Sequence, residues 1–187
     1  MSKQLMQSIP GRILSFLVLV LFTFLVIVGV RGAIAEDESD VAQTVGWAEN
    51  VAITGVESTV SAKFDTGATT TSLNAEILEK PSEDVESGGI VRFNFIDADG
   101  NKTLFERPLE RWVKIVGDDR RPVVKMNLCL AGKWIEGEAN LSDREDLDYA
   151  VLVGRNMLQE GQLAVSSADN FTLSKAVQRR CEQGDNR

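Results

Sequence analysis

The chain of 187 residues contains no histidine and only two cysteines. Without histidine there can be no Ser-His-Asp triad, no Cys-His pair and no histidine-ligated zinc site. Two cysteines are also too few for a closed zinc site made of thiolates alone. If the protein is an enzyme, carboxylates or hydroxyls must therefore carry its chemistry.

Basic residues are scarce outside the N-terminal region. The chain has 20 Lys+Arg against 28 Asp+Glu, and three of the basic residues, Lys3, Arg12 and Arg31, lie in residues 1–35, which contain no acidic residue. Residues 36–187 therefore carry a net charge of −11, which repels nucleic acid and anionic lipid head groups. Because the sequence also has no basic stripe with interleaved aromatic residues, we do not expect nucleic-acid binding.

The longest apolar run lies near the N-terminus. Residues 13–30 are uncharged and almost wholly apolar, and a small-x-small triplet that ends at Ala35 follows them. A basic start, an apolar stretch and such a triplet are typical of an export signal, but the run is also about long enough to span a bilayer. Residues 1–35 are thus either a signal peptide cut near Ala35 or an anchor in the inner membrane. Both alternatives predict an exported, periplasmic domain.

Export permits disulfides, so the state of Cys129 and Cys181 matters. Residue alternation places Cys129 on the polar face of a predicted strand at residues 123–130. Cys181 lies in a polar C-terminal tail, residues 175–187, which we expect to fray. We expect two unpaired thiols without a catalytic role; a bridge that ties the tail to the strand is the alternative.

Short apolar stretches separated by turn residues predict an all-β domain over residues 46–174, after an acidic linker at residues 36–45. The turn sequences Asp99-Gly100 and Ala131-Gly132 each predict a hairpin. The expected strands are residues 51–53, 60–64, 90–96, 103–105, 123–130, 133–141, 149–153, 162–165 and 171–173. Short helices are expected at residues 72–80 and 156–160, and a loop at residues 80–89.

The sharpest local feature is Asp65-Thr66-Gly67, which directly follows the predicted strand at residues 60–64. Taken alone, it indicates only a strand followed by a turn, because Asp and Gly are common turn residues. About 90 residues later, however, the apolar strand at residues 149–153 is followed by Gly-Arg-Asn-Met-Leu. An Asp-Thr-Gly loop followed by an apolar strand and Gly-Arg-Asn-x-Leu resembles the two-part signature of retropepsins, the single-lobe aspartic proteases.

More closely, the chain resembles a bacterial family of retropepsin-like aspartic endopeptidases, whose members are often labelled ATP-dependent zinc proteases. The resemblance runs in order over residues 46–173. It is carried by Gly46-Trp47-x-Glu49 and by residues 62–68, 121–124, 141–146 and 152–155. It implies an all-β fold, namely a small closed, mostly antiparallel barrel with one short helix.

The chain departs from this family directly after the Asp-Thr-Gly-Ala stretch. The family usually continues with Arg-Thr-Ser-Ala-Leu-His, whereas this chain has Thr-Thr-Thr-Ser-Leu-Asn at residues 69–74. Any family role that depends on that Arg or that His is therefore lost. The absence of histidine also undermines the zinc label for this chain.

An aspartic protease needs two carboxylates that share one proton. The ionised one activates a water, and the protonated one polarises the scissile carbonyl. The chain has one Asp-Thr-Gly, so the resemblance implies a homodimer in which Asp65 lies beside its own copy. It further implies that the Thr66 hydroxyl supports this pair, that Gly67 permits a close backbone approach, and that Ala68 completes the loop.

Three further residues are expected beneath this loop. The resemblance implies that Gly154, Arg155 and Asn156 pack there as structural support, and we assign them no chemical step.

A flap must cover the substrate and exclude water. The candidate is the turn Gly117-Asp118-Asp119, beside which Arg120 and Arg121 would contact an acidic or C-terminal group of the substrate. An ordinary exposed hairpin is the alternative.

No metal or cofactor is expected. Asp143, Glu145 and Asp146 are interpreted as a solvated acidic loop rather than a cation site. The stretch that begins at Asp97 resembles a calcium loop, but its twelfth position is Pro108 rather than Glu.

The main hypothesis is an exported aspartic endopeptidase whose partners are a polypeptide substrate and a second copy of the chain. A non-catalytic periplasmic or membrane-associated binding module on the same fold is the alternative, and a metallopeptidase is the weakest interpretation.

Overall fold

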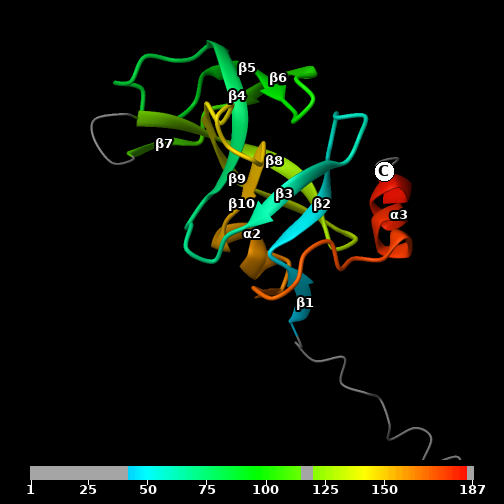
Figure 1. Ribbon diagram of the computed structural model, residues 1–187. Helices are drawn as coiled ribbons and strands as arrows, with labels where there is room; N and C mark the ends of the chain where they lie inside the picture. The colour runs from blue at the N-terminus through cyan, green and yellow to red at the C-terminus, as the bar shows by residue number, and fades with distance from the viewer. Residues whose placement is uncertain (1–41, 115–119, 185–187) are drawn as a thin grey trace, which may run out of the picture. The chain divides into compact units, whose positions relative to one another are not determined.

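The computed structural model describes residues 42–114 and 120–184 (Figure 1). The predicted leader at residues 1–35 and the turn Gly117-Asp118-Asp119 lie outside the described residues. Within the described part of the chain, no helix has the length and apolar character needed to cross a membrane.

Six strands form a closed barrel. They follow one another around a ring in the order β10-β3-β2-β8-β9-β4, and the pairing of β10 with β4 closes it. The β3–β10 and β4–β9 pairings are parallel, and the others in the ring are antiparallel. The expected small closed, mostly antiparallel barrel is thereby confirmed. The strands are β2 (Ala48–Ile53), β3 (Val60–Phe64), β4 (Thr71–Glu79), β8 (Arg120–Leu130), β9 (Lys133–Ser142) and β10 (Val151–Val153).

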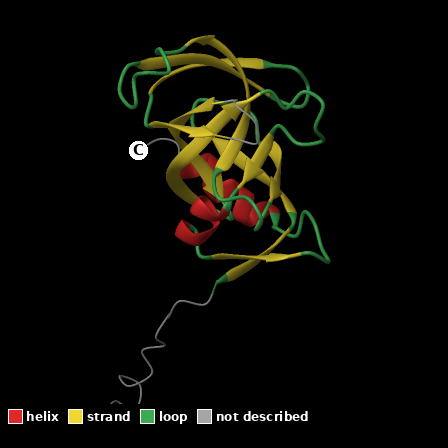
Figure 2. Ribbon diagram, turned by 90° about the vertical axis from the view of Figure 1, so that its left-hand side faces the viewer, coloured by secondary structure: helices red, strands yellow, loops and turns green. Residues whose placement is uncertain are grey.

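The remaining strands extend or flank this barrel. A hairpin of β5 (Ile90–Ile96) and β6 (Lys102–Pro108) adds to β4, and β7 (Arg111–Lys114) pairs with β8. Two segments distant in sequence, β1 (Gln43–Gly46) and β11 (Leu163–Ser166), form a separate parallel pair. This pair lies at the foot of the view in Figure 2. The last residues of the linker expected at residues 36–45 are therefore part of a strand, because β1 begins at Gln43.

The core follows from residue alternation along the strands. In β5 the side chains of Val91, Phe93 and Phe95 are all buried, as their spacing predicts. Phe93 also stacks on Phe105 of β6, with 5.6 Å between ring centroids. Both predicted hairpin turns form. Gly100 has φ +82°, and Ala131-Gly132 has φ +50° and +81°, the left-handed conformation that tight hairpin turns require.

Helix α2 (Arg155–Glu160) confirms the short helix expected at residues 156–160. The helix expected at residues 72–80 is wrong, because that segment is strand β4, hydrogen-bonded to β5, β9 and β10. The strand expected at residues 171–173 is also wrong. That segment forms no ladder, and Phe171 has φ +49°.

The C-terminal tail forms helix α3 (Lys175–Gly184) instead of fraying. Cys181 of this helix is bonded to Cys129 of β8, so the expectation of two unpaired thiols is wrong. Cys129 does lie on the outer face of its strand, but α3 packs over that face and leaves it 0% exposed. The disulfide therefore fixes the helix against the outside of the barrel.

Candidate active site

Asp65 lies at the end of β3, where the chain leaves the barrel wall. Its backbone N–H donates to Val153 O of the neighbouring strand β10 at 2.9 Å. One carboxylate oxygen, Oδ1, accepts the backbone N–H of Gly67 at 2.8 Å, and the Asp65 carbonyl accepts the N–H of Ala68 at 3.3 Å. The side chain is half-buried, so the loop fixes the carboxylate while leaving it open to solvent.

The space around Gly67 is restricted by Asp65 itself. A Cβ built on Gly67 would lie 3.1 Å from Asp65 Oδ1. A side chain there would therefore press on the carboxylate, which explains why the loop has glycine at this position. Thr66, by contrast, is exposed.

Gly154 and the start of α2 lie directly beneath this loop. The backbone N–H of Arg155 donates to Ala68 O at 2.9 Å, and that of Asn156 donates to Thr69 O at 3.2 Å. A Cβ on Gly154 would lie 2.6 Å from the carbonyl carbon of Thr70. This backbone contact leaves no room for any side chain at residue 154.

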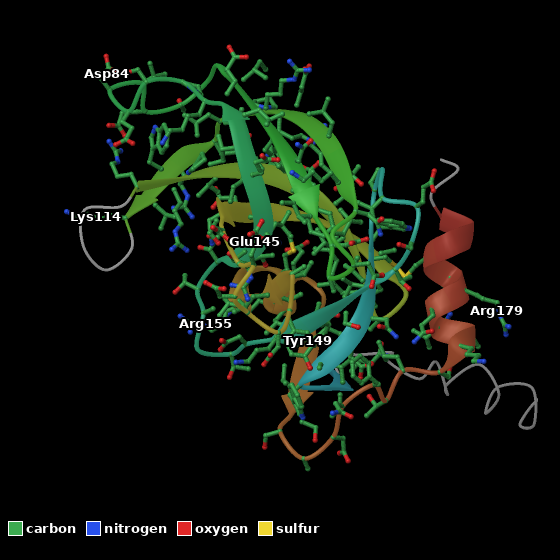
Figure 3. The ribbon with its side chains drawn as sticks, turned by 45° about the horizontal axis from the view of Figure 1, so that its top comes forward. Asp84, Lys114, Glu145, Tyr149, Arg155 and Arg179 are labelled. Carbon is green, nitrogen blue, oxygen red and sulfur yellow. A yellow bond between two sulfur atoms is a disulfide. The ribbon has the colours of Figure 1, made fainter. Side chains whose placement is uncertain are left out.

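The Arg155 side chain reaches back over the loop (Figure 3). One guanidinium nitrogen donates to Thr66 O at 2.8 Å and to Gly67 O at 3.1 Å, and the other donates to Thr69 Oγ1 at 3.1 Å. The planar guanidinium thus bridges two carbonyls and a hydroxyl. Thr69, which stands where the resembling family has arginine, supplies one of these acceptors.

Asn156 connects the loop to the opposite wall of the barrel. Its Oδ1 accepts both the N–H and the Oγ1–H of Thr71, at 3.0 and 3.1 Å, and its Nδ2 donates to Glu138 O at 2.7 Å. Thr71 Oγ1 in turn accepts the N–H of Gly154 at 3.1 Å. The structure therefore brings together the predicted stretches around Asp65 and Asn156 through one hydrogen-bond network.

Of the predicted flap, the structure describes Arg120 and Arg121 of β8, and Arg120 pairs with Lys114 of β7. The guanidinium of Arg120 is held by the loop at residues 80–89. It donates to Glu83 O at 2.8 Å and lies 5.6 Å from the centroid of the Trp112 ring. Arg121 instead lies close enough to Arg144 for the two charges to interact.

Arg144 is a site residue to which the sequence analysis assigned no role. Its backbone N–H donates to Asn74 Oδ1 at 2.8 Å and its Nε donates to Tyr149 O at 3.1 Å, so both ends are anchored. Burial lowers the pKa of Arg144, and the nearby charge of Arg121 lowers it further, while the Asp65 carboxylate acts in the opposite direction. A cation therefore lies within electrostatic reach of Asp65.

The expected acidic loop is held by local hydrogen bonds. Asp143 Oδ1 accepts the backbone N–H of Glu145 at 3.0 Å. In the separate turn that begins at Asp97, the Asp97 carboxylate accepts the backbone N–H groups of Asp99 and Asn101 at 2.9 and 2.8 Å. Among the described residues, no group of three or more acidic or cysteine side chains is arranged to hold a metal ion.

A closed barrel with an Asp-Thr-Gly loop supported by Gly-Arg-Asn defines the class of single-lobe, retropepsin-like aspartic peptidases. The family model described as "RimB-like: Retropepsin-like aspartic endopeptidase RimB" matches residues 44–176, and the chain belongs to this family.

One solved structure similar to this chain is that of protein Lpg0085, of unknown function, from Legionella pneumophila subsp. pneumophila str. Philadelphia 1. The two sequences are 32% identical, the match covers 71% of this chain and 98% of that one, and the TM-score is 0.61. No curated protein matches the chain.

Proposed function

We propose that the protein is an exported aspartic endopeptidase that acts as a homodimer. Membership of the family supports the reaction class. The observation that carries the proposal is the Asp65 carboxylate, which accepts the Gly67 N–H within a loop whose Thr66 and Gly67 carbonyls are bound by the Arg155 guanidinium. This loop presents one carboxylate per chain, whereas the reaction needs two. A two-fold axis that passes beside Asp65 supplies the second.

In the proposed reaction, the two Asp65 carboxylates share one proton. The ionised carboxylate takes a proton from a water molecule, whose oxygen attacks the scissile carbonyl carbon. The protonated carboxylate donates to the carbonyl oxygen. Collapse of the tetrahedral intermediate breaks the C–N bond. The amine leaves with a proton from the pair, and one hydroxyl of the intermediate returns a proton to the pair as the new carboxyl group forms. The β7–β8 hairpin is the proposed flap over this site.

The proposed export is supported by the apolar leader sequence and by the disulfide. Disulfides persist in oxidising compartments and are rare in the cytosol, and the Cys129–Cys181 bond fixes helix α3. Both observations favour a periplasmic domain, either anchored through residues 13–30 or released by cleavage near Ala35.

Cleavage of an unfolded protein tests the proposed reaction. The full chain, purified in detergent, is incubated with the substrate between pH 4 and pH 9, beside the Asp65→Asn variant and with or without a chelator. The variant is expected to fold, since an amide oxygen still accepts the Gly67 N–H, but to lose all cleavage. Two carboxylates that share a proton titrate in two steps, so we expect a bell-shaped profile with an acidic maximum.

Activity that persists in Asp65→Asn, stays level to pH 9 or disappears with the chelator would contradict the aspartic mechanism. Absence of cleavage by a folded wild-type dimer would favour the alternative, a non-catalytic binding module on the same fold.

A further inference from the structure

A groove of about 600 Å³ lies on the outer face of β3 and β10, the two strands that precede the Asp65 loop and Gly154. Lys63 and Leu152, which pair across these two strands, both line it. Their strand neighbours are buried in the core, so alternation directs these two side chains outward. Asp65 follows Lys63 by two residues, and Arg144, whose charge interacts with that of Asp65, also lines the groove.

The walls of this groove are largely aromatic and aliphatic. Trp47 and Tyr149 meet edge to face, with 6.1 Å between ring centroids. Leu147 and Phe171 are 55% and 45% exposed. Large apolar side chains that surround a concave surface mark a binding site. Figure 3 shows Tyr149 and Arg155 on the same side of the barrel, away from Arg179 of α3.

Phe171 is held in an unfavourable backbone conformation. Its φ of +49° lies in the left-handed region, which is an outlier for a bulky residue. Such strain persists only where the surrounding structure enforces it, and it is concentrated at functional sites. Core packing does not explain it here, because nearly half of the side chain is exposed.

Hydrogen bonds on both sides of Phe171 hold the backbone in this conformation. The Phe171 N–H donates to Ala48 O at 2.8 Å, and Asp169 O accepts the N–H of Trp47 at 2.9 Å. On the C-terminal side, the carboxylate of Glu49 accepts the N–H and the hydroxyl of Thr172 at 2.9 and 2.6 Å.

Glu49 is itself 0% exposed and also accepts the N–H groups of Gly46 and Leu173, at 2.9 and 3.3 Å. A buried carboxylate with four donors is a rigid anchor for the segment that carries Phe171.

From this geometry we infer that Phe171 is a specificity-determining residue of the proposed peptidase. It forms one wall of a subsite that accepts an aromatic side chain of the substrate next to the cleaved bond. The groove has room for such a ring, and the rings of Trp47, Tyr149 and Phe171 offer edges and faces for it to pack against. The cations Lys63 and Arg144 share the groove with the anion Asp148. This inference rests on the proposed function.

The Phe171→Gly variant tests the inference without risk to the fold, because glycine adopts a φ of +49° without strain. Full-chain wild type and variant digest the same unfolded protein, and mass spectrometry identifies every cleaved bond. We expect wild type to favour aromatic over alanine side chains at one position beside the cleaved bond. This ratio should fall about tenfold in Phe171→Gly. Leu104→Ala, which removes a similarly exposed apolar side chain from β6, should leave the ratio unchanged.

An unchanged ratio in Phe171→Gly, or a wild-type preference for acidic side chains, would overturn the inference. A second measurement separates it from the proposed function. The Asp65→Asn protein is titrated with dye-labelled peptides that differ only in one central Phe or Ala, with fluorescence anisotropy as the readout. Tighter binding of the Phe peptide that is lost in Asp65→Asn/Phe171→Gly supports the subsite even if wild type cleaves nothing. Equal binding of the two peptides overturns the subsite even if wild type is an active peptidase.

Discussion

Asn156 shows how a single side chain can position the candidate catalytic loop without contacting Asp65. Its amide satisfies the N–H and hydroxyl of Thr71 and the carbonyl of Glu138, which belong to two different strands. Removing the amide leaves these partly buried groups without their partner.

We expect Asn156→Ala to lower the free energy of unfolding by about 2–4 kcal/mol, because an unsatisfied buried polar group costs about 1–3 kcal/mol and several are left here. Urea unfolding followed by circular dichroism measures this change. Gln159→Ala, an exposed substitution in the same helix, is the control and should change stability by less than about 0.5 kcal/mol. Equal urea midpoints for the two variants would show that the hydrogen bonds of Asn156 contribute nothing to stability.

At this scale, the sequence predicts part of the candidate site. Asp65 and Asn156 are found because both lie in local motifs whose order along the chain is informative. Phe171 is not found, since its proposed role depends on hydrogen bonds to Glu49, more than 120 residues earlier. The only sequence signal for this part of the site was the stretch that contains Trp47 and Glu49. It contributes to the family resemblance, but the sequence assigns no chemical role to either residue.

At the scale of secondary structure, β4 shows where local propensity fails. Residues 72–80 include Leu, Ala, Glu and Lys, which favour helix. The segment is nevertheless a strand, because tertiary pairing overrides local preference. Its polar residues have partners inside the fold. Ser72 bonds Asn140 at 3.0 Å, and Asn74 donates to Ile96 O at 3.2 Å. Both faces of this strand are buried near Leu73, so its sequence lacks the alternation of apolar and polar residues that predicts a strand.

Helix α3 depends on the disulfide for its position. Of the α3 residues whose side chains are described, only Cys181 is buried. The other described side chains of α3 are half-buried or exposed, so the disulfide is the most buried attachment of this helix. The crosslink joins residues 52 apart in sequence. Closing a loop of that length restricts the unfolded chain and thereby stabilises the folded state by about 4 kcal/mol.

We therefore expect the Cys129→Ala/Cys181→Ala variant to lose up to about 4 kcal/mol of stability and to release α3 from the barrel. Limited proteolysis with trypsin measures the release, because Lys175, Arg179 and Arg180 are exposed. Reductant should produce the same cleavage pattern in wild type and have no effect on the variant. Protection of α3 in the variant would show that its noncovalent contacts suffice.

At the scale of the whole molecule, one chain supplies only half of the proposed active site. The barrel was predicted from the strand pattern and the resemblance, and it is confirmed. The barrel presents one Asp-Thr-Gly loop, so the proposed carboxylate pair requires two copies of the chain. Sequence alone could not define the surface that would join them, because such a surface consists of side chains from separate strands.

Subunit mixing tests this central claim most directly. Wild type is dissociated and reassociated with a ninefold excess of Asp65→Asn, and cleavage is measured per wild-type chain. If each active site needs two Asp65 carboxylates, only about one wild-type subunit in ten finds a wild-type partner. Activity should then fall about tenfold, whereas the same excess of Leu104→Ala should not reduce it. Activity that is unchanged by excess Asp65→Asn would show that one chain holds a complete active site and would contradict the account.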